Sequence, residues 1–184
     1  MSKIPVCLAF LIELVALSSC DRFRLNRDIS RIMESTVALP AKVSVSIGGE
    51  VYPMEDSLRA VPKMVVYIDS TECSMCRVSK FYLYEPIYRL SRETGAFELM
   101  LLMYPTKIEG ITISRIIADM EMAIPVYVDD NDTFLSDNQF IPKDSRLHSF
   151  FVDETGRPVF VGDPALNADV DAILKKYLNK TIQR

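Results

Sequence analysis

The order of apolar and polar stretches predicts an α/β fold built on a mixed β-sheet. Three observations lead to this class. First, an apolar run, Met64–Ile68, precedes a helix that opens on Cys73-Ser74-Met75-Cys76. Second, another apolar run, Phe97–Met103, follows that helix. A strand, a helix and a strand within about forty residues require a right-handed crossover and a parallel strand pair. Third, residues 147–161 contain two short strands around a turn, which adds an antiparallel hairpin.

Composition narrows the class of protein. The chain has 184 residues, of which 49% are hydrophobic, and this suits one globular domain with a substantial core and a short extension. Its formal net charge is −4, with charges of both signs spread along the chain. Nucleic-acid binding requires a basic surface, so we expect no nucleic-acid partner.

The first twenty residues form a separate kind of segment. Lys3 precedes an apolar run, Ile4–Leu17, which is short for a membrane span and typical of a secretory signal. The ending Leu17-Ser18-Ser19-Cys20 resembles the bacterial lipobox. That resemblance implies that Cys20 is diacylated, becomes the mature N-terminus and attaches the protein to a membrane. Glu13 departs from the usual apolar run, and an uncleaved apolar helix is the alternative.

Residues 20–60 are predicted to contain a tether and an accessory element. Arg27–Thr36 places apolar side chains on one face of a short helix. Lys42–Ile47 alternates like a strand, and Gly48-Gly49 can turn it into a second strand, Glu50–Tyr52. The expected organisation is therefore a signal peptide over 1–19, a lipid-anchored tether and accessory element over 20–60, and a main domain over 61–184.

In the main domain, Met64–Ile68 is apolar throughout, as in a central strand covered on both faces. The helix that follows is predicted to reach about Arg92, with a kink at Pro86 and an end at Thr94-Gly95. Phe97–Met103 is the second buried strand.

The remaining elements complete the order. Ile111–Met122 has apolar side chains at helical spacing, Ile124–Val128 is a short strand, and Asp129–Asp132 is a polar loop. Leu147–Val152 and the strand after it form the hairpin. The last helix is predicted over Asn167–Leu178, with Asn167 as its N-cap.

Two cysteines separated by two residues at a helix start can close a disulfide within the first turn. The helix N-terminus favours a thiolate because it carries partial positive charge and unpaired N–H groups. Cys73 would be the exposed nucleophile and Cys76 the resolving thiol. If Cys7 leaves with a signal peptide and Cys20 carries lipid, these two form the remaining pair.

This arrangement resembles the thioredoxin superfamily, whose active site is a C-x-x-C where a strand meets its helix. Within it, F-F-V-D-E-T-G-R-P-V-F-V-G-D-P (Phe150–Pro164) resembles a stretch of TlpA/ResA-type proteins, and I-P-V-Y-V-D (Ile124–Asp129) resembles the strand before it. The resemblance covers about residues 60–180. Together with the lipobox, it is similar to the thioredoxin-like lipoproteins of Bacteroidetes-type bacteria.

The resemblance implies a three-layer α/β/α fold with a mixed central sheet. It also implies a thiol–disulfide oxidoreductase of the cell envelope, facing the periplasm or the exterior, that acts on protein thiols and disulfides. No cofactor is implied. In this mechanism Cys73 forms a mixed disulfide with a protein substrate and Cys76 resolves it.

The chain departs from the family at three places. Counting back from Asp153, Leu147 stands where the family has a cis-proline, and we expect a trans peptide there because a cis non-proline bond costs about 3 kcal/mol. Tyr67 stands where thioredoxin has a buried acid. Thr71-Glu72 replaces the usual tryptophan and its neighbour, and no tryptophan occurs in the chain.

Several polar residues are candidates for tuning the cysteines. Glu72 and Asp69 are candidate proton acceptors that would raise the pKa of Cys73, and both are also compatible with solvated or strand-end roles. His148, next to Leu147 in the substrate loop, could tune the thiolate or could be hydrogen-bonded and inert.

Two other functions stay open. The cysteine pair could be a structural disulfide in a binding or scaffold lipoprotein, as the three departures suggest. Alternatively, Cys73, Cys76 and His148 could form a copper site in a copper-handling protein. A structural zinc site is not expected, since only three soft ligands remain after maturation.

Overall fold

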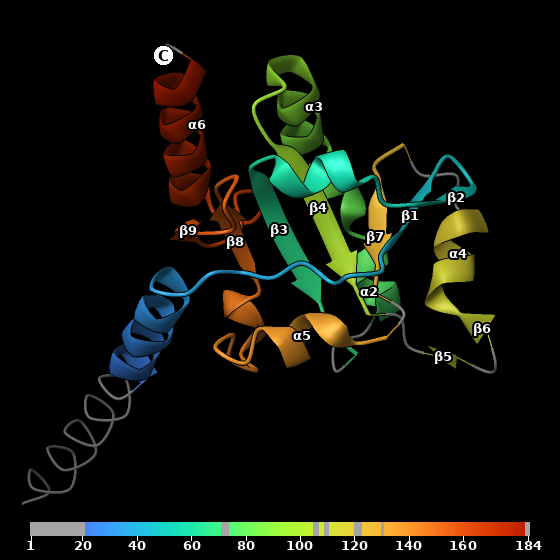
Figure 1. Ribbon diagram of the computed structural model, residues 1–184, viewed down its shortest axis with the longest axis horizontal. Helices are drawn as coiled ribbons and strands as arrows, with labels where there is room; N and C mark the ends of the chain where they lie inside the picture. Colours follow the sequence, from blue (N-terminus) through green and yellow to red (C-terminus); the bar gives the residue numbers. More distant parts are fainter. Residues whose placement is uncertain are drawn as a thin grey trace, which may run out of the picture.

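The structure, a computed structural model, describes residues 21–70, 74–104, 107–108, 111–119, 123–129 and 131–182. A seven-stranded sheet has the order β2-β1-β7-β4-β3-β8-β9 (Figure 1). Its strands are β1 Ser44–Ile47, β2 Glu50–Pro53, β3 Lys63–Ile68, β4 Glu98–Met103, β7 Val126–Val128, β8 Ser149–Val152 and β9 Pro158–Val161. A separate small hairpin joins β5 Lys107–Ile108 to β6 Ile111–Thr112.

Strand direction divides the sheet into a centre and two edges. β3, β4 and β7 run parallel, whereas β8 is antiparallel to β3 and β1 is antiparallel to β7. Each edge is completed by a hairpin, β1–β2 on one side and β8–β9 on the other. The parallel β3–β4 pair and the β8–β9 hairpin confirm two of the sequence predictions.

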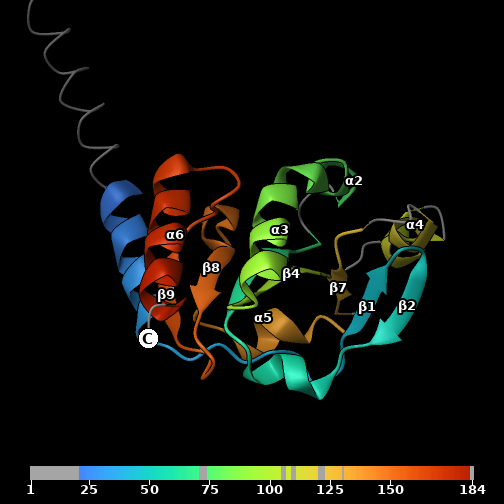
Figure 2. The ribbon, with the colours of Figure 1, turned by 90° about the horizontal axis from the view of Figure 1, so that it is seen from above.

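Helices cover both faces of the sheet. They are α2 Ser74–Val78, α3 Glu85–Thr94, α4 Ile113–Asp119, α5 Thr133–Asp137 and α6 Ala168–Ile182, with 3₁₀ helices η1 Asp56–Ala60, η2 Phe81–Tyr84 and η3 Ser145–Leu147. Figure 2 shows α2, α3 and α6 on one side of the sheet, and α5 on the other side together with the segment before β3. This is the predicted three-layer α/β/α arrangement.

The core has two parts, one on each face. All six residues of β3 and all six of β4 are buried, so these strands contribute alternate side chains to both faces. Met64 and Val66 join the cluster under α3 and α6, whereas Val65 and Tyr67 join the cluster under α5. A central strand covered on both faces is what the unbroken apolar run Met64–Ile68 predicts.

The helix after the cysteines differs from the prediction. Instead of one kinked helix to Arg92, the chain forms α2, then η2, then α3, with a break at Ser79-Lys80. Pro86 occupies the first turn of α3, where its missing N–H and fixed φ favour a helix start over a kink. The predicted end is confirmed: Gly95 caps α3 with φ of 59°.

Other boundaries shift for local reasons. The strand predicted from Leu147 begins at Ser149, because the His148 N–H donates to Ser145 O and closes η3. The helix predicted over Ile111–Met122 is α4, which starts only after β6. The Asn167 cap is confirmed, since its side-chain oxygen accepts hydrogen bonds from Asp169 N and Val170 N.

The N-terminal segment contains a helix and a hairpin, and the hairpin joins the sheet. A helix covers residues 21–33, starting earlier than the predicted Arg27–Thr36. The predicted hairpin is confirmed, with φ of 57° at Gly48 and 84° at Gly49, and β1 pairs with β7, so this hairpin extends the central sheet. The signal and lipobox residues lie outside the described part, so the domain boundaries stay predictions. None of the helices in the described ranges is long and apolar enough to cross a membrane.

Candidate functional site

The helix that carries Cys76 follows the edge where the parallel strands end. β3, β4 and β7 share a direction, so their carboxyl ends meet at one edge of the sheet, and α2 begins six residues after β3 ends. Cys76 lies on α2, is exposed, and is disulfide-bonded. Cys73 and Glu72 lie outside the described residues, as does Cys20. Binding sites in open α/β sheets lie at the carboxyl ends of their strands.

Tyr67 occupies the centre of this edge. Its side chain is fully buried, and its hydroxyl donates to Asp132 Oδ1 at 3.4 Å. Burial first, and then the nearby carboxylates, chiefly that of Asp132, raise the pKa of Tyr67 far above its usual value. Burial likewise raises the pKa of Asp132. Tyr67 therefore stays neutral at ordinary pH and donates a hydrogen bond, so it does not replace a buried carboxylic acid as a proton acceptor.

His148 is buried against Tyr67, with ring centres 5.6 Å apart. Its Nε2 lies 2.8 Å from Pro142 O, so Nε2 is the protonated donor to that carbonyl. Its Nδ1 lies 3.9 Å from Asp69 Oδ2 and makes no hydrogen bond within the described part of the chain. The structure thus brings together Asp69 and His148, two of the predicted tuning residues, and leaves one buried ring nitrogen facing a carboxylate.

Leu147, the residue at the position of the family's cis-proline, has a trans peptide bond and a buried side chain. The described residues contain no cis peptide bond, which confirms the trans peptide expected before Leu147. Leu147 is buried at the end of η3 and so presents its side chain to the interior. The His148 carbonyl accepts a hydrogen bond from Tyr67 N at 2.9 Å, which fixes this segment to β3.

The structure describes two of the three residues of the hypothetical copper site, Cys76 and His148. Among the described residues, no group of three or more histidine, cysteine, aspartate or glutamate side chains could hold a metal ion. The set Cys73, Cys76 and His148 includes a residue outside that part. Because Nε2 of His148 is bound to Pro142, a metal at this histidine would have to use Nδ1, which faces Asp69.

Sequence reasoning missed the role of the loop after β7. Asp129 is fully buried and accepts hydrogen bonds from Phe134 N at 2.8 Å and from the Thr133 hydroxyl, so it holds the start of α5. Asp132, with φ of 53°, then reaches Tyr67. The sequence did contain a signal for this helix: Asp129 directly follows an apolar strand, and a carboxylate in that place can accept hydrogen bonds from the start of a following helix.

The opposite end of β3 carries a second polar cluster. Lys63 is 2% exposed, and its ammonium donates to Arg59 O at 2.9 Å and to Val61 O. Burial lowers the pKa of Lys63 to about 8, and the Glu98 charge opposes this shift. The Tyr127 hydroxyl donates to Glu98 Oε1 at 2.9 Å, and burial followed by Glu98 raises the pKa of Tyr127.

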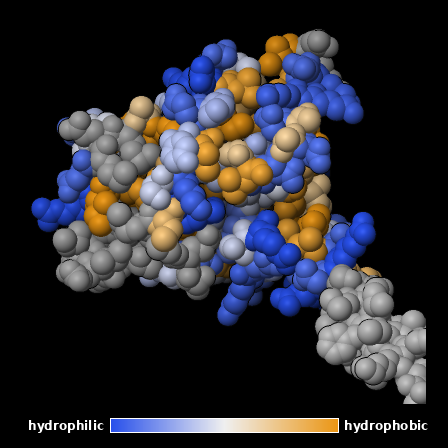
Figure 3. Space-filling model, turned by 180° about the vertical axis from the view of Figure 1, so that it is seen from behind, coloured by the Kyte–Doolittle hydropathy of each residue, from blue (hydrophilic) through white to orange (hydrophobic). Residues whose placement is uncertain are grey.

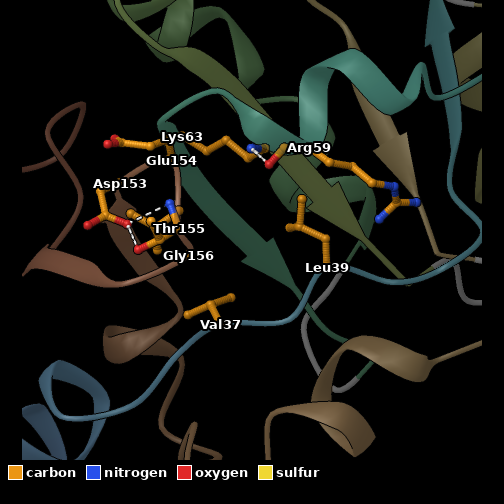
Figure 4. A pocket seen from close by; sticks show the side chains of 9 residues that line it. Val37, Leu39, Arg59, Lys63, Asp153, Glu154, Thr155 and Gly156 are labelled. Carbon is orange, nitrogen blue, oxygen red and sulfur yellow. Dashed lines mark hydrogen bonds between the residues drawn. The ribbon is translucent and has the colours of Figure 1, made fainter.

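A pocket of about 220 Å³ lies beside this lysine. Its wall includes Val37, Leu39, Val152 and the turn around Gly156, and Figure 4 shows the Lys63 chain crossing its upper side toward Arg59. The lysine nitrogen already donates to two carbonyl groups, and the rest of the lining combines apolar residues with Arg59, Asp153, Glu154 and Thr155.

Comparison with known proteins identifies the fold. The sequence matches no protein-family model, and no curated protein matches it. Among solved structures, a Chlorobium tepidum protein described as a candidate thiol:disulfide interchange protein DsbE aligns with a TM-score of 0.50 at 13% identity, over 78% of this chain and 98% of that chain. The thioredoxin domain of a thiol-disulfide oxidoreductase from Bacteroides vulgatus aligns with a TM-score of 0.45 at 18% identity, over 76% of this chain and 97% of that one. From its sheet order, its layers and the first of these alignments, the chain has a thioredoxin-like α/β fold.

Proposed function

We propose that this protein exchanges thiols and disulfides with other proteins through Cys73 and Cys76. The observation that carries the proposal is the disulfide-bonded Cys76 on α2, at the carboxyl edge of the parallel strands in a thioredoxin-like fold. We infer that Cys73, three residues earlier in the chain, is its disulfide partner.

The reaction proceeds in two exchanges. In the reduced protein, the Cys73 thiolate attacks one sulfur of a substrate disulfide, and the first substrate thiolate leaves and takes up a proton. The Cys76 thiolate then attacks Cys73 Sγ, which releases the second substrate thiolate and forms the Cys73–Cys76 disulfide. Two electrons pass from the protein to the substrate. In the opposite direction the oxidised protein oxidises a substrate dithiol, and a thiol or disulfide partner of the cell envelope restores the starting state.

The buried pair Asp69 and His148 is the candidate for handling the proton of the resolving thiol. Tyr67 has the position of the family's buried acid but not its chemistry, whereas Asp69 directly follows β3 and its carboxylate faces His148 Nδ1. Glu72, next to Cys73, is a second candidate. Arg77 and Lys80 after Cys76 favour the thiolates, and the two carboxylates oppose them.

The same proposal includes a location, a lipid anchor in the cell envelope. A lipobox ending at Cys20 supports a lipid anchor, and an envelope location supplies the oxidising setting in which such a pair cycles. A helix covers residues 21–33, directly after the lipobox cysteine in the sequence, so an anchored protein would lie close to the membrane.

A static disulfide in a binding or scaffold protein is the second candidate. The trans peptide before Leu147 and the neutral Tyr67 favour it, since both replace parts that assist exchange in the family. In that case Cys73 and Cys76 would stabilise the start of α2 and would not turn over.

A redox titration separates the two candidates. We would titrate the full-length protein carrying Cys7→Ser and Cys20→Ser, which leaves one cysteine pair, through a series of glutathione buffers. A reversible two-electron transition between about −120 and −270 mV supports exchange. A pair that stays oxidised below about −300 mV identifies a structural disulfide and overturns the proposal.

A further inference from the structure

A small recess lies directly beside the cysteine helix, on the face covered by α3 and α6. It is formed by the end of α2, by η2 and by the loop before α6. The lining residues are Arg77, Lys80, Tyr82, Leu83, Tyr84 and Leu166. Its volume is about 160 Å³. Sites for drug-sized ligands usually measure about 300–1,000 Å³, so this recess suits a single side chain better than a metabolite.

The recess has exposed apolar walls on a fixed base. Tyr82 is 70% exposed and Leu166 is 59% exposed, which is unusual for large apolar side chains so close together. Tyr84 below them is buried, and its hydroxyl donates to Asp163 Oδ2 at 2.6 Å, which ties η2 to the loop that carries Leu166. Figure 3, which views this side of the molecule, shows hydrophobic surface bordered by hydrophilic residues. The recess is therefore preformed and open to solvent.

Charge distinguishes this recess from its surroundings. Of the six lining residues that the structure describes, Arg77 and Lys80 are basic and none is acidic, although the whole chain has a net charge of −4. A second recess on the other side of Tyr82 has the opposite character, with Glu85 as its only charged lining residue among those described. A partner that approaches the cysteine helix along the first recess therefore meets positive charge and apolar surface together.

We infer that this recess binds an apolar side chain of the substrate protein next to acidic residues, and so directs acidic, apolar segments to the cysteine pair. The inference rests on the proposed function, because the bound segment is the one that undergoes exchange. The apolar side chain would cover Tyr82 and Leu166, and the flanking carboxylates would face Lys80. Charge complementarity of this kind acts mainly on association rate and specificity.

The test uses three peptides that each carry one cysteine joined to glutathione by a disulfide. They have the sequences Glu-Leu-Glu, Lys-Leu-Lys or Glu-Gly-Glu next to the cysteine and are otherwise identical. The reduced full-length protein, in the Cys7→Ser, Cys20→Ser background, attacks this disulfide and Cys76 resolves it, so one glutathione and one peptide thiol are released per turnover. The initial rate of release is compared with the rate on oxidised glutathione.

We expect the Glu-Leu-Glu peptide to react about tenfold faster than either of the other two. Lys80→Glu should reverse the preference between the acidic and basic peptides, and Leu166→Ser should remove the preference for leucine over glycine. Both effects are ratios within one protein, so a change in thiol pKa cancels. Tyr52→Ala, which removes a 53% exposed aromatic ring on β2, is the matched control and should leave every ratio unchanged.

Two outcomes overturn the inference, and they are distinguishable. If the protein reduces oxidised glutathione but treats the three peptides equally, or keeps its preferences in both variants, the recess does not select substrates and the proposed function stands. If no disulfide, including that of oxidised glutathione, is reduced, the proposed function fails and the inference fails with it.

Discussion

The two ends of β3 both bury charged or titratable groups, but they treat them differently. At the amino end, Lys63 donates to two backbone carbonyls and Glu98 accepts from Tyr127, so the cluster is held by fixed partners. At the carboxyl end, the buried His148 Nδ1 faces the Asp69 carboxylate from 3.9 Å without a hydrogen bond among the described residues. Satisfied polar networks make a fold rigid, whereas unsatisfied groups collect at functional sites. The amino end thus has the character of a structural cluster, and the buried ring nitrogen that lacks a hydrogen-bond partner in the described part of the chain lies at the end for which we propose the chemistry.

The largest expected effect is at the carboxyl end. Cys73→Ser should reduce turnover to the rate without protein, because the attacking sulfur is gone, and Cys76→Ser should accumulate mixed disulfides, because nothing resolves them. Reduction of oxidised glutathione and mass spectrometry of trapped adducts measure the two effects. Unchanged turnover in Cys73→Ser would contradict the mechanism.

At the amino end, Lys63→Met should alter stability and its pH dependence but not the reduction potential. In the folded protein burial lowers the pKa of Lys63 to about 8, so between pH 8 and about 10 the unfolded chain binds more protons. The free energy of unfolding attributable to Lys63 therefore rises with pH across this window, by at most about 3 kcal/mol.

Urea unfolding of wild type and Lys63→Met between pH 7 and 10 measures this rise. The Met variant should lack this rise. Below pH 8 two effects oppose each other in the variant: the hydrogen bonds to two backbone carbonyls are lost, and the free-energy cost of burying the lysine charge is removed. Equal pH slopes in both proteins, or a changed reduction potential in the variant, would break the comparison between the two ends.

The turn beside the amino-end pocket gives a smaller effect. Gly156 has φ of 81°, and a Cβ there would lie 2.7 Å from Val37 O. Gly156→Ala should lower the free energy of unfolding by more than the 1–2 kcal/mol roughly expected for a left-handed backbone alone. Gly95→Ala is the matched control, with φ of 59° and open space around its Cβ. Equal losses in the two variants would show that the Val37 segment moves aside freely.

The smallest expected effect is on proton handling. Asp69→Asn and His148→Asn should each slow exchange about tenfold and change the shape of its pH–rate profile, while Lys63→Met changes neither. Alkylation rates of the reduced protein between pH 5 and 9 report the thiolate directly. Profiles that match wild type in both variants would assign Asp69 and His148 to structure alone.

The elements that sequence predicted correctly are those that local pattern decides. Residues 64–68 are apolar without interruption, Gly48-Gly49 supplies two positive φ values, and Asn167 caps its own helix. The helix α5 was missed although Asp129 holds its start locally, because the residue after its end is fixed by distant contacts: Asn138 exchanges hydrogen bonds with the backbone of Ala38, one hundred positions earlier.

The candidate site also has some features that the local sequence predicts and others that depend on distant contacts. The cysteine spacing and the nearness of His148 to the end of β3 followed from the motif and the strand order. The contact from Tyr67 to Asp132, and the joining of Tyr84 to Asp163, depend on how separate loops meet in space. No pattern along the chain specifies which loops meet, so neither the acidic surroundings of Tyr67 nor the recess at Leu166 could be predicted.

The pairing of β1 with β7 has a consequence for how the chain is made. Ser44 lies opposite Val128, so a hairpin that leaves the ribosome early has no sheet to join until most of the chain has followed. Contacts between distant positions form late, and strands that wait for their partners expose hydrogen-bonding edges in the meantime. The β1–β2 ribbon is short and ends at Pro53, which limits wrong pairing during that delay. If the chain is exported amino end first, this ribbon reaches the far side early and has to wait there for β7, whereas the β8–β9 hairpin pairs with a β3 strand that is already present.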